Sequence, residues 1–245
     1  MSGVPQSSAI VTCPDGVVIG VVGGIGSGKS SVVRWVAQRF PVAVLDADSI
    51  GHEVLLSTEI KQQLRQRFGE EIFDVEGEID RKTLARKVFG DAPQFLAARR
   101  QLERIVHPEI RRRIQTGVYT TEGHPGSGVV LLDAAILLEA GWRDLCRWVV
   151  LIDCPRAVRL ARVLEHRGWS EDELDRRERC QWPLAEKRRL ADVIIDNSGE
   201  LAVAGEQLAA VVRRCLAFKP GRGILQADET LSLTERQRRP SDTTR

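Results

Sequence analysis

The feature of this sequence that most restricts its fold is a glycine-rich turn between a buried strand and a helix. Residues 17–23 are continuously apolar and rich in β-branched side chains, which is typical of a strand buried on both faces. The run that follows, Gly23-Gly-Ile-Gly-Ser-Gly-Lys-Ser30, matches the pattern G-x-x-x-x-G-K-[ST] in full. Apolar residues at helical spacing then continue to Phe40. This order predicts a phosphate-binding loop for a nucleoside triphosphate.

Each residue type in this loop has a chemical reason. Glycines permit positive φ angles, so that successive backbone N–H groups can curl round a phosphate, and the helix that begins near Lys29 adds its positive N-terminal dipole. Lys29 is expected to reach the β- and γ-phosphates, Ser30 to place its hydroxyl on Mg²⁺, and Ser31 to bond an inner phosphate. The residues predicted to bind ATP in this loop are Gly24, Ile25, Gly26, Ser27, Gly28, Lys29, Ser30 and Ser31.

The rest of the chain predicts an α/β fold. Short apolar runs at 42–46, 129–133, 148–153 and 193–196 read as further strands, and helical patterns separate most of them. Strands that alternate with helices form a parallel sheet covered on both faces, so we expect a P-loop NTPase-type sheet. Aspartate ends most of these strands, at the carboxyl edge where open α/β sheets bind ligands.

Three kinds of segment surround the predicted core of residues 17–48, 129–155 and 191–218. Residues 49–116 are mostly helical by pattern and read as an inserted helical subdomain, whereas 156–190 are dense in arginine and glutamate and read as a lid. Ser170 with Glu173 forms a capping box that starts a helix inside this lid. Residues 1–16 are expected to be a flexible leader and 219–245 a disordered tail, which leaves one kinase-sized domain at 17–218.

Composition restricts the partners of the chain. The chain has 36 Lys and Arg residues and 34 Asp and Glu residues. Residues 219–245 contain six of the basic and four of the acidic ones, which leaves 30 of each in residues 1–218, so that this part is neutral overall. A neutral body argues against a broad nucleic-acid surface, and no apolar run reaches the 18 or so residues of a membrane helix. The five cysteines are odd in number and include no C-x-x-C pair. We therefore expect reduced thiols in a cytoplasmic protein. A monomer is the default expectation for the oligomeric state.

Asp46 and Asp48 follow the second predicted strand and allow two interpretations. A carboxylate near the γ-phosphate can accept the proton of an attacking hydroxyl, which suits Asp48, while Asp46 is expected to pack against the phosphate loop through hydrogen bonds. Aspartate at this position is also a common helix cap or turn residue. The pair alone does not decide between the two interpretations.

The ordered motifs resemble the dephospho-CoA kinase family from residue 18 to about 199. Beyond the phosphate loop the matching motifs are Asp46-Ala-Asp48, Ile79-Asp-Arg-Lys-Thr-Leu84 with Val88-Phe89, Ile105-Val-His-Pro108, Ile136-Leu-Leu-Glu139, Asp153-Cys-Pro155, Glu186-Lys-Arg-Arg-Leu-Ala-Asp192 and Val193-Ile-Ile-Asp-Asn-Ser-Gly199. Many families share the phosphate loop, but this combination is far more specific.

The resemblance implies transfer of the γ-phosphoryl group of ATP, with Mg²⁺, to the ribose 3′-hydroxyl of dephospho-CoA. It also implies a P-loop core, a helical CoA domain and a lid. It places Asp48 at the catalytic base, and Lys29 and Arg162 at the phosphates, where a guanidinium can fork two hydrogen bonds to one anion. By itself, Arg162 also reads as a solvated helix residue.

The same resemblance supplies less specific site residues. On the acceptor side these are Asp48, Arg81, His107, Leu137 and Glu139; near the adenine it is Asn197, and Asp133 is a candidate for the surroundings of Mg²⁺. Three of them also have a plain structural explanation: a surface helix residue for Arg81, a helix boundary for His107-Pro108, and turn chemistry for Asn197.

Four positions depart from the family pattern. Val22 replaces the usual threonine before the loop, Ala135 replaces a proline, His52 replaces an arginine, and His166-Arg167 stands where an arginine-aspartate pair is expected. The first three put acceptor-pocket details in question, and the last does so for lid closure. Two other functions stay open on the residues alone: a different small-molecule P-loop kinase, for a nucleoside or nucleotide, and a non-catalytic ATP-binding regulator.

Overall fold

The computed structural model describes residues 17–90, 92–119 and 128–217, so the predicted leader and tail lie outside the described residues. The elements in chain order are β1 Val17–Gly23, α1 Lys29–Ala37, β2 Ala43–Asp46, α2 Ala47–Val54, α3 Thr58–Phe68, η1 Glu70–Ile72, α4 Arg81–Val88, α5 Pro93–Tyr119, β3 Val129–Asp133, η2 Arg143–Leu145, β4 Trp148–Asp153, α6 Arg156–Arg167, α7 Glu171–Glu178, α8 Leu184–Leu190, β5 Val193–Asp196 and α9 Leu201–Ala217. Across these residues no helix has both the length and the apolar character needed to cross a bilayer.

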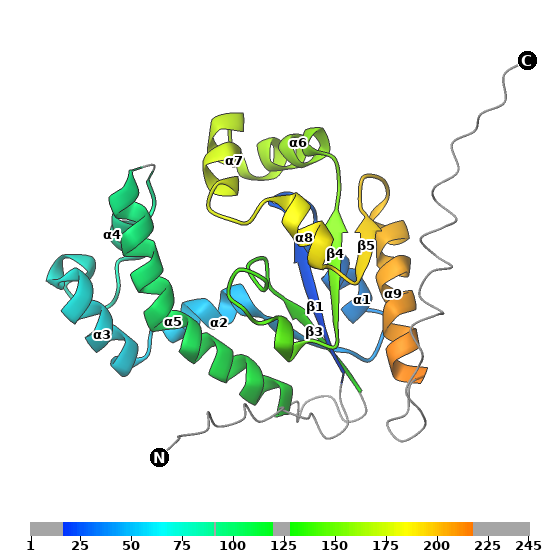
Figure 1. The fold of residues 1–245 in the computed structure, drawn as a ribbon, viewed down its shortest axis with the longest axis horizontal. Helices are drawn as coiled ribbons and strands as arrows, with labels where there is room; N and C mark the ends of the chain where they lie inside the picture. The colour runs from blue at the N-terminus through cyan, green and yellow to red at the C-terminus, as the bar shows by residue number, and fades with distance from the viewer. Residues whose placement is uncertain (1–16, 91, 120–127, 218–245) are drawn as a thin grey trace, which may run out of the picture.

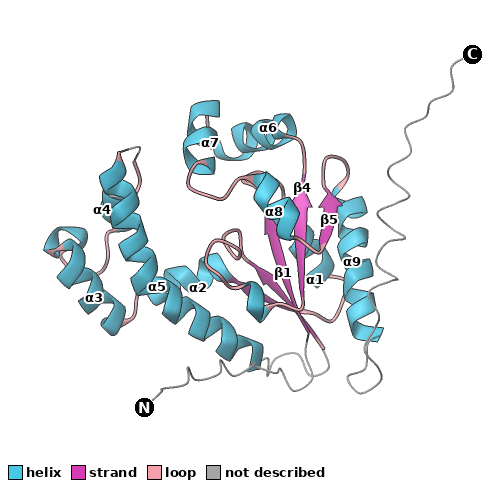
Figure 2. Cartoon of the chain, in the orientation of Figure 1, coloured by secondary structure: helices cyan, strands magenta, loops and turns pink. Residues whose placement is uncertain are grey.

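All five predicted strands are present and form one parallel sheet in the order β2-β3-β1-β4-β5. Figure 2 shows the strands side by side with helices on both faces, which confirms the predicted α/β class. The register aligns Asp46 with Asp133 and Asp153 with Asp196, so carboxylates lie in neighbouring pairs at the carboxyl edge. The central strand, β1, ends at that same edge in the glycine loop.

Two apolar layers cover the sheet. On one face α1 and α9 pack through Val32, Val36, Leu208 and Val212 against Ile19 and its neighbours. On the other face the core continues without a break into the helices α2–α5 (Figure 1). Since β1 contributes buried side chains to both layers, its run of β-branched residues is explained by burial on two sides.

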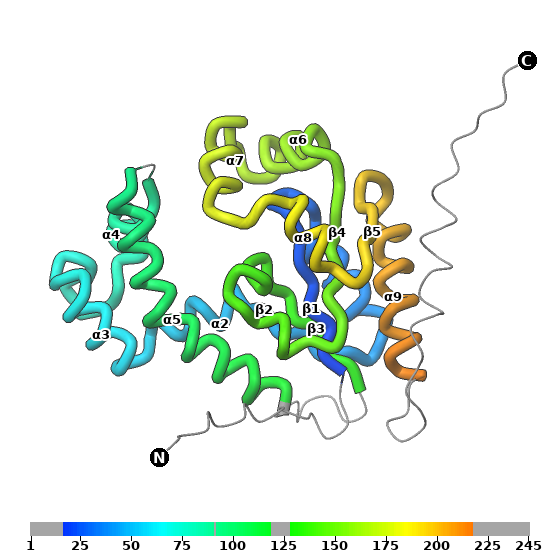
Figure 3. Tube along the Cα trace, in the orientation of Figure 1, coloured from blue at the N-terminus to red at the C-terminus, as the bar shows by residue number. Residues whose placement is uncertain are grey.

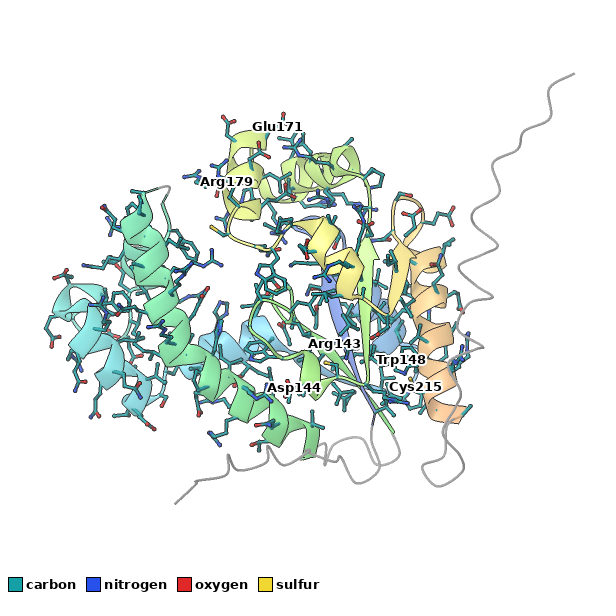
Figure 4. All side chains as sticks on the ribbon, in the orientation of Figure 1. Arg143, Asp144, Trp148, Glu171, Arg179 and Cys215 are labelled. Atoms are coloured by element: carbon teal, nitrogen blue, oxygen red, sulfur yellow. The ribbon has the colours of Figure 1, made fainter. Side chains whose placement is uncertain are left out.

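The helices α2–α5 occupy the segment predicted as a helical subdomain. Figure 3 shows the chain leave the sheet after β2, run through these helices and return as β3. The long helix α5 is attached to the core by Arg111, whose guanidinium donates to both carboxylate oxygens of Asp144 at 2.9 and 2.6 Å. Arg143 donates from a single nitrogen, Nη2, to both carboxylate oxygens of Asp192 at 3.1 and 2.9 Å. Figure 4 labels Arg143 and Asp144 close together at one end of the core.

Two local sequence signals can be compared with the structure. The helix boundary that His107-Pro108 taken alone would indicate is absent, because both residues lie inside α5. Proline removes one backbone hydrogen bond there, and the buried residues Val106 and Ile110 on either side keep the helix in place by packing. The predicted cap at Ser170 is present, because its side chain accepts a hydrogen bond from the N–H of Glu173 at the start of α7.

Candidate active site

The glycine loop joins β1 to α1 and has the backbone shape that its sequence requires. Gly26 and Gly28 adopt φ angles of 76° and 81°, in the left-handed region that favours glycine. A Cβ at Gly26 would stand 2.7 Å from the backbone oxygen of Arg159, and one at Gly28 would collide with the side-chain amide nitrogen of Asn197. The loop is therefore enclosed by α6 on one side and by the end of β5 on the other.

A cleft of about 470 Å³ opens over this loop and over the N-terminus of α1. The lining residues outside the loop come from the start of α2, the turn after β3, the stretch from the end of β5 to the start of α9, and the segment 156–190. The full lining is Gly23, Gly24, Ile25, Gly26, Ser27, Gly28, Lys29, Ser30, Ser31, Asp48, Ala135, Arg162, Val163, His166, Arg167, Gln181, Asn197, Gly199 and Leu201. All eight loop residues predicted to bind ATP thus meet in one cleft, together with Asp48, Arg162 and Asn197.

Lys29 forms an ion pair with Asp133, the last residue of β3. Both side chains are nearly buried, at 11% and 6% exposed. A buried lysine and carboxylate each need a charged partner, and the parallel register supplies it by ending β3 beside β1. The ammonium group is thereby fixed at the floor of the cleft, in the residue next to Ser30.

The two aspartates after β2 have different roles in the structure. Asp46 is the N-cap of α2, and its carboxylate accepts hydrogen bonds from the N–H groups of Asp48 and Ser49 at 2.9 and 3.3 Å. These hydrogen bonds go to α2, whereas the prediction directed them to the phosphate loop. Asp48 instead projects into the cleft from the first turn of α2.

Asp48 as a whole is exposed, but its carboxylate lines the cleft and is partly buried by the protein around it. This burial raises the pKa of Asp48, and the positive charge of Lys29 opposes the shift. The nearby carboxylates of Asp46 and Asp133 add to the increase. A carboxylate whose pKa is raised is a stronger base than an ordinary aspartate, which suits proton removal from a hydroxyl.

Arg162 and Asn197 close the end of the cleft beside Gly28. Arg162 donates from Nη2 to the carbonyl of Asn197 at 2.8 Å and from Nη1 to the carbonyl of Ser27 at 3.3 Å. The Asn197 amide also donates to the Ser27 carbonyl, at 2.7 Å, and its side-chain oxygen is buried without a partner among the described residues. These bonds orient both side chains towards the loop, and their contacts with ATP stay a prediction.

Four of the five predicted acceptor residues lie outside the cleft lining, and two of these, Arg81 and His107, belong to the helices α2–α5. Arg81 begins α4 and its guanidinium is 2.7 Å from Nε2 of His52 on α2. His107 packs edge-on against Trp142, with ring centroids 5.5 Å apart, and burial lowers its pKa. Both residues belong to the helical side of the molecule, and their acceptor roles stay predictions.

The motif that ends in Glu139 is built into the interior. Leu137 has no exposed surface and packs against Gly20 of β1, so in this conformation it is a core residue and cannot touch a substrate. Glu139 pairs with the buried Lys187 of α8 at 2.7 Å and accepts the N–H of Trp182 at 3.0 Å. These contacts correct the substrate-contact prediction for Leu137 and assign Glu139 an interior ion pair.

The four departures from the family pattern lie in different surroundings. Val22 is fully buried in the sheet, and His52 is exposed beside Arg81. Ala135 lines the cleft and its carbonyl accepts a hydrogen bond from Lys187 at 2.7 Å. His166 also lines the cleft, one turn of α6 beyond Arg162.

Two residues without a predicted role lie against the site in the structure. Arg159 and Lys187 are 6% and 1% exposed, yet both occur in runs dense in charged residues, where solvent exposure is the usual outcome. Arg159 lies behind the glycine loop, and Lys187 links α8 to the turn after β3. No local pattern distinguishes them from their exposed neighbours, because their burial is decided by tertiary packing.

Comparison with known proteins agrees with this geometry. The family model "Dephospho-CoA kinase" matches residues 17–203. The dephospho-CoA kinase of Parasynechococcus marenigrum is 39% identical over 199 residues, covering 80% of this chain and 93% of that protein. The dephospho-CoA kinase of Thermus thermophilus is 35% identical over 208 residues, covering 84% and 96%.

Solved structures show the same fold. The crystal structure of TT1252 from Thermus thermophilus superposes with a TM-score of 0.67 at 33% identity, covering 81% of this chain and 97% of that one. Dephospho-CoA kinase from Campylobacter jejuni superposes with a TM-score of 0.52 at 24% identity, covering 81% and 96%. The family match spans most of the chain and includes the glycine loop, Asp48 and Arg162. The chain therefore belongs to the dephospho-CoA kinase family.

Proposed function

We propose that this protein transfers the γ-phosphoryl group of ATP to the ribose 3′-hydroxyl of dephospho-CoA, giving CoA and ADP. The observation that carries the proposal is the single cleft in which a complete phosphate loop, a carboxylate of raised pKa and a lid arginine meet. Membership of the family supplies the acceptor, and the cleft supplies the groups that phosphoryl transfer needs.

The donor half of the site is assigned to the loop and to α1. The loop amides and the N-terminus of α1 hold the phosphates, and the ammonium group of Lys29 neutralises charge on them. Arg162, already turned towards the loop by the carbonyls of Ser27 and Asn197, adds a second cation at the Gly28 end of the loop. Catalysis of this kind consists mainly of positioning and electrostatic stabilisation.

The residues around the cleft fit Mg²⁺ that arrives with the nucleotide. The hydroxyl of Ser30 and the carboxylates of Asp48 and Asp133 lie at or beside the floor of the cleft, and the described residues contain no cluster of three or more His, Cys, Asp or Glu that could hold a metal by itself. One or two protein oxygens together with phosphate oxygens are the ligands that Mg²⁺ takes in kinases. Bound there, the ion would neutralise charge on the phosphate oxygens.

Asp48 is proposed as the base that orients the 3′-hydroxyl and accepts its proton. The residue stands in the first turn of α2, between the loop and the helices predicted to hold CoA. Its raised pKa favours proton acceptance from the attacking hydroxyl. The acceptor must therefore approach from the α2 side of the cleft, opposite Asn197.

The test is formation of CoA from ATP and dephospho-CoA by the purified protein. Asp48→Asn is expected to lower kcat by about 10²–10⁴-fold, the usual contribution of a general base, with little change in ATP affinity. Asp46→Asn is the matched control, because it removes a neighbouring carboxylate while asparagine still caps α2. Normal turnover by Asp48→Asn would remove the base assignment, and turnover of a nucleoside monophosphate in place of dephospho-CoA would remove the acceptor assignment.

A cellular location and an oligomeric state are also proposed. We infer a cytoplasmic location, supported by Cys146, Cys154, Cys180 and Cys215, which are all free thiols, as is usual in a reducing compartment. We also infer a monomer, because both ends of the cleft are built from residues of one chain.

A further inference from the structure

Arg159 is a buried cation that the reaction described above does not use. It lies on α6, only 6% of its surface is exposed, and burial lowers its pKa, which reflects the electrostatic cost of a cation in that place. Arginine is rarely buried unless its charge is matched. Its surroundings therefore indicate what the charge does.

The guanidinium lies directly behind the first half of the glycine loop. Its Nη1 pairs with Glu178 of α7 and donates to the carbonyl of Ile25 at 3.3 Å. A Cβ on Gly24 would stand 3.4 Å from the same nitrogen. The Nε group is buried and has no partner among the described residues. One donor of the guanidinium is thus unsatisfied although its charge is paired with Glu178, and the backbone of residues 24–26 lies between the guanidinium and the cleft.

The sheet order shows which end of the nucleotide lies nearest to Arg159. Gly28 faces Asn197, beyond β5, whereas Gly24 faces Arg159 and the side chain of Leu184 on α8. The helix α8 is bonded through Lys187 to the turn after β3, on the side of the sheet where β2 leads to the proposed base. The Gly24 end is therefore the transfer end, where the γ-phosphate must lie to meet the acceptor.

We propose that Arg159 is a positioning residue for the transferred phosphoryl group, acting through the backbone of residues 24–26 and through its charge. This inference rests on the proposed function, because it takes its direction from the placement of the acceptor. Arg162 serves the Gly28 end of the loop, and Arg159 serves the γ-phosphate side from behind the loop. Glu178 pairs with the guanidinium and offsets part of its charge.

A simpler role for Arg159 would be a brace, meaning an ion pair that only holds α6 against α7. The electrostatic role and the brace role predict different results. If Arg159 acts by its charge, removal of the Glu178 charge leaves ATP binding as tight as before or tighter, because less of the positive charge is offset. If the ion pair is only a brace, loss of either partner weakens the lid equally. Arg156 provides the matched control: it also pairs across to α7, with Glu171 at 2.5 Å, but it is exposed. Figure 4 labels Glu171 at the upper end of α7.

The experiment measures the affinity of the full chain for ATP and for ADP, with Mg²⁺, by calorimetry. It compares Arg159→Gln, Arg159→Lys, Glu178→Gln and Arg156→Gln with the original protein. Arg159→Gln is expected to weaken ATP binding about tenfold and ADP binding much less, since the charge acts on the γ-phosphate end. Arg159→Lys keeps the charge and should recover most of the loss. Glu178→Gln should bind ATP at least as tightly as the original protein, and Arg156→Gln should bind it as tightly as the original protein.

Turnover provides a second measurement for the same variants. In Arg159→Gln, kcat/KM for ATP should fall while KM for dephospho-CoA stays unchanged. Equal losses of ATP and ADP affinity, or equal damage from Arg159→Gln and Glu178→Gln, would overturn the proposal. If Arg159→Gln does not fold, the comparison of Arg159→Lys with Glu178→Gln decides, because both keep the cation and both must bind ATP normally. The binding measurements need no acceptor, so they remain decisive even if dephospho-CoA is not the substrate.

Discussion

The ion pair of Lys187 and Glu139 offers a quantitative test of how the interior is held together. The lysine is 1% exposed and its partner side chain 12% exposed, with 2.7 Å between Nζ and Oε1. Replacing Glu139 by glutamine leaves a buried ammonium without a countercharge, and losing one partner of such a pair costs about 3–5 kcal/mol. For a chain of this size each kcal/mol lowers Tm by about 2–4 °C, so Glu139→Gln should lower it by roughly 6–20 °C.

The double variant distinguishes an ion pair from two independent contacts. Lys187→Met alone leaves the carboxylate of Glu139 without a countercharge and removes the hydrogen-bond donor of the Ala135 carbonyl. Its cost in unfolding free energy should therefore be similar, about 3–5 kcal/mol. In Glu139→Gln with Lys187→Met, no charge of this pair is left, and glutamine can still accept the N–H of Trp182. The double variant should therefore lose about as much as either single one, which is a coupling of about 3–5 kcal/mol.

Urea unfolding followed by circular dichroism measures these differences, with Tm as a second reading. The matched control is Glu186→Gln, which breaks the exposed pair with Arg189 on the same helix, α8. An exposed pair contributes about 0–1 kcal/mol, so this control should unfold almost as the original protein does. Losses below about 1 kcal/mol in both single variants, or strictly additive losses in the double one, would refute the assignment of a buried, coupled pair.

Three further outcomes are expected. Because burial raises the pKa of Asp48, the folded state disfavours its ionised form, and kcat should fall as the pH drops through this raised pKa. For the same reason Asp48→Asn should stabilise the protein at neutral pH, and this gain in stability should disappear below the ordinary pKa of 3.8. A gain in stability that persists in acid would contradict this. Gly26→Ala should abolish ATP binding, because the new Cβ would collide with the α6 backbone. Gly168 also has a positive φ but open space around it, so Gly168→Ala should lower the free energy of unfolding in urea by only about 1–2 kcal/mol. A thiol reagent at pH 8 should label Cys180 before Cys146, whose pKa burial raises to about 12; early labelling of Cys146 in peptide mapping would show that its site is open.

Local sequence signals were sufficient for the parts of the site that are continuous in the chain. The strand, the glycines, Lys29 and Ser30 are adjacent, and each has a geometric requirement that few other residues satisfy. The five strands were also predictable, since β-branched runs buried on both faces are typical of parallel sheets. Asp48 was a harder case, because a carboxylate after a strand is equally suited to capping, and in the structure Asp46 takes the cap.

Residues that meet only in the folded chain were not predictable in the same way. Leu137 and Glu139 belong to a recognisable motif, but a motif does not tell whether a side chain faces a substrate or the interior. Arg159 and Lys187 stand among many charged residues, and only the packing of α6 and α8 onto the glycine loop and the β3 turn buries them. His107 and its proline resemble a boundary because the packing that keeps α5 intact comes from distant residues.

The buried polar side chains show how a neutral chain can bind polyanions. Among the described residues they are Ser27, Asp133, Arg159, Lys187 and Asn197, and all five lie at the carboxyl edge of the sheet, in or directly behind the cleft. Burying polar groups costs stability, so their concentration at one place indicates that the cost is tolerated where fixed charges and dipoles are needed. Net charge does not reveal such a site, because the buried cations Arg159 and Lys187 are matched by Glu178 and Glu139, and the nearly buried Lys29 is matched by Asp133. Fixed charges of both signs, rather than an excess of one sign, allow the cleft to hold phosphates in a defined order.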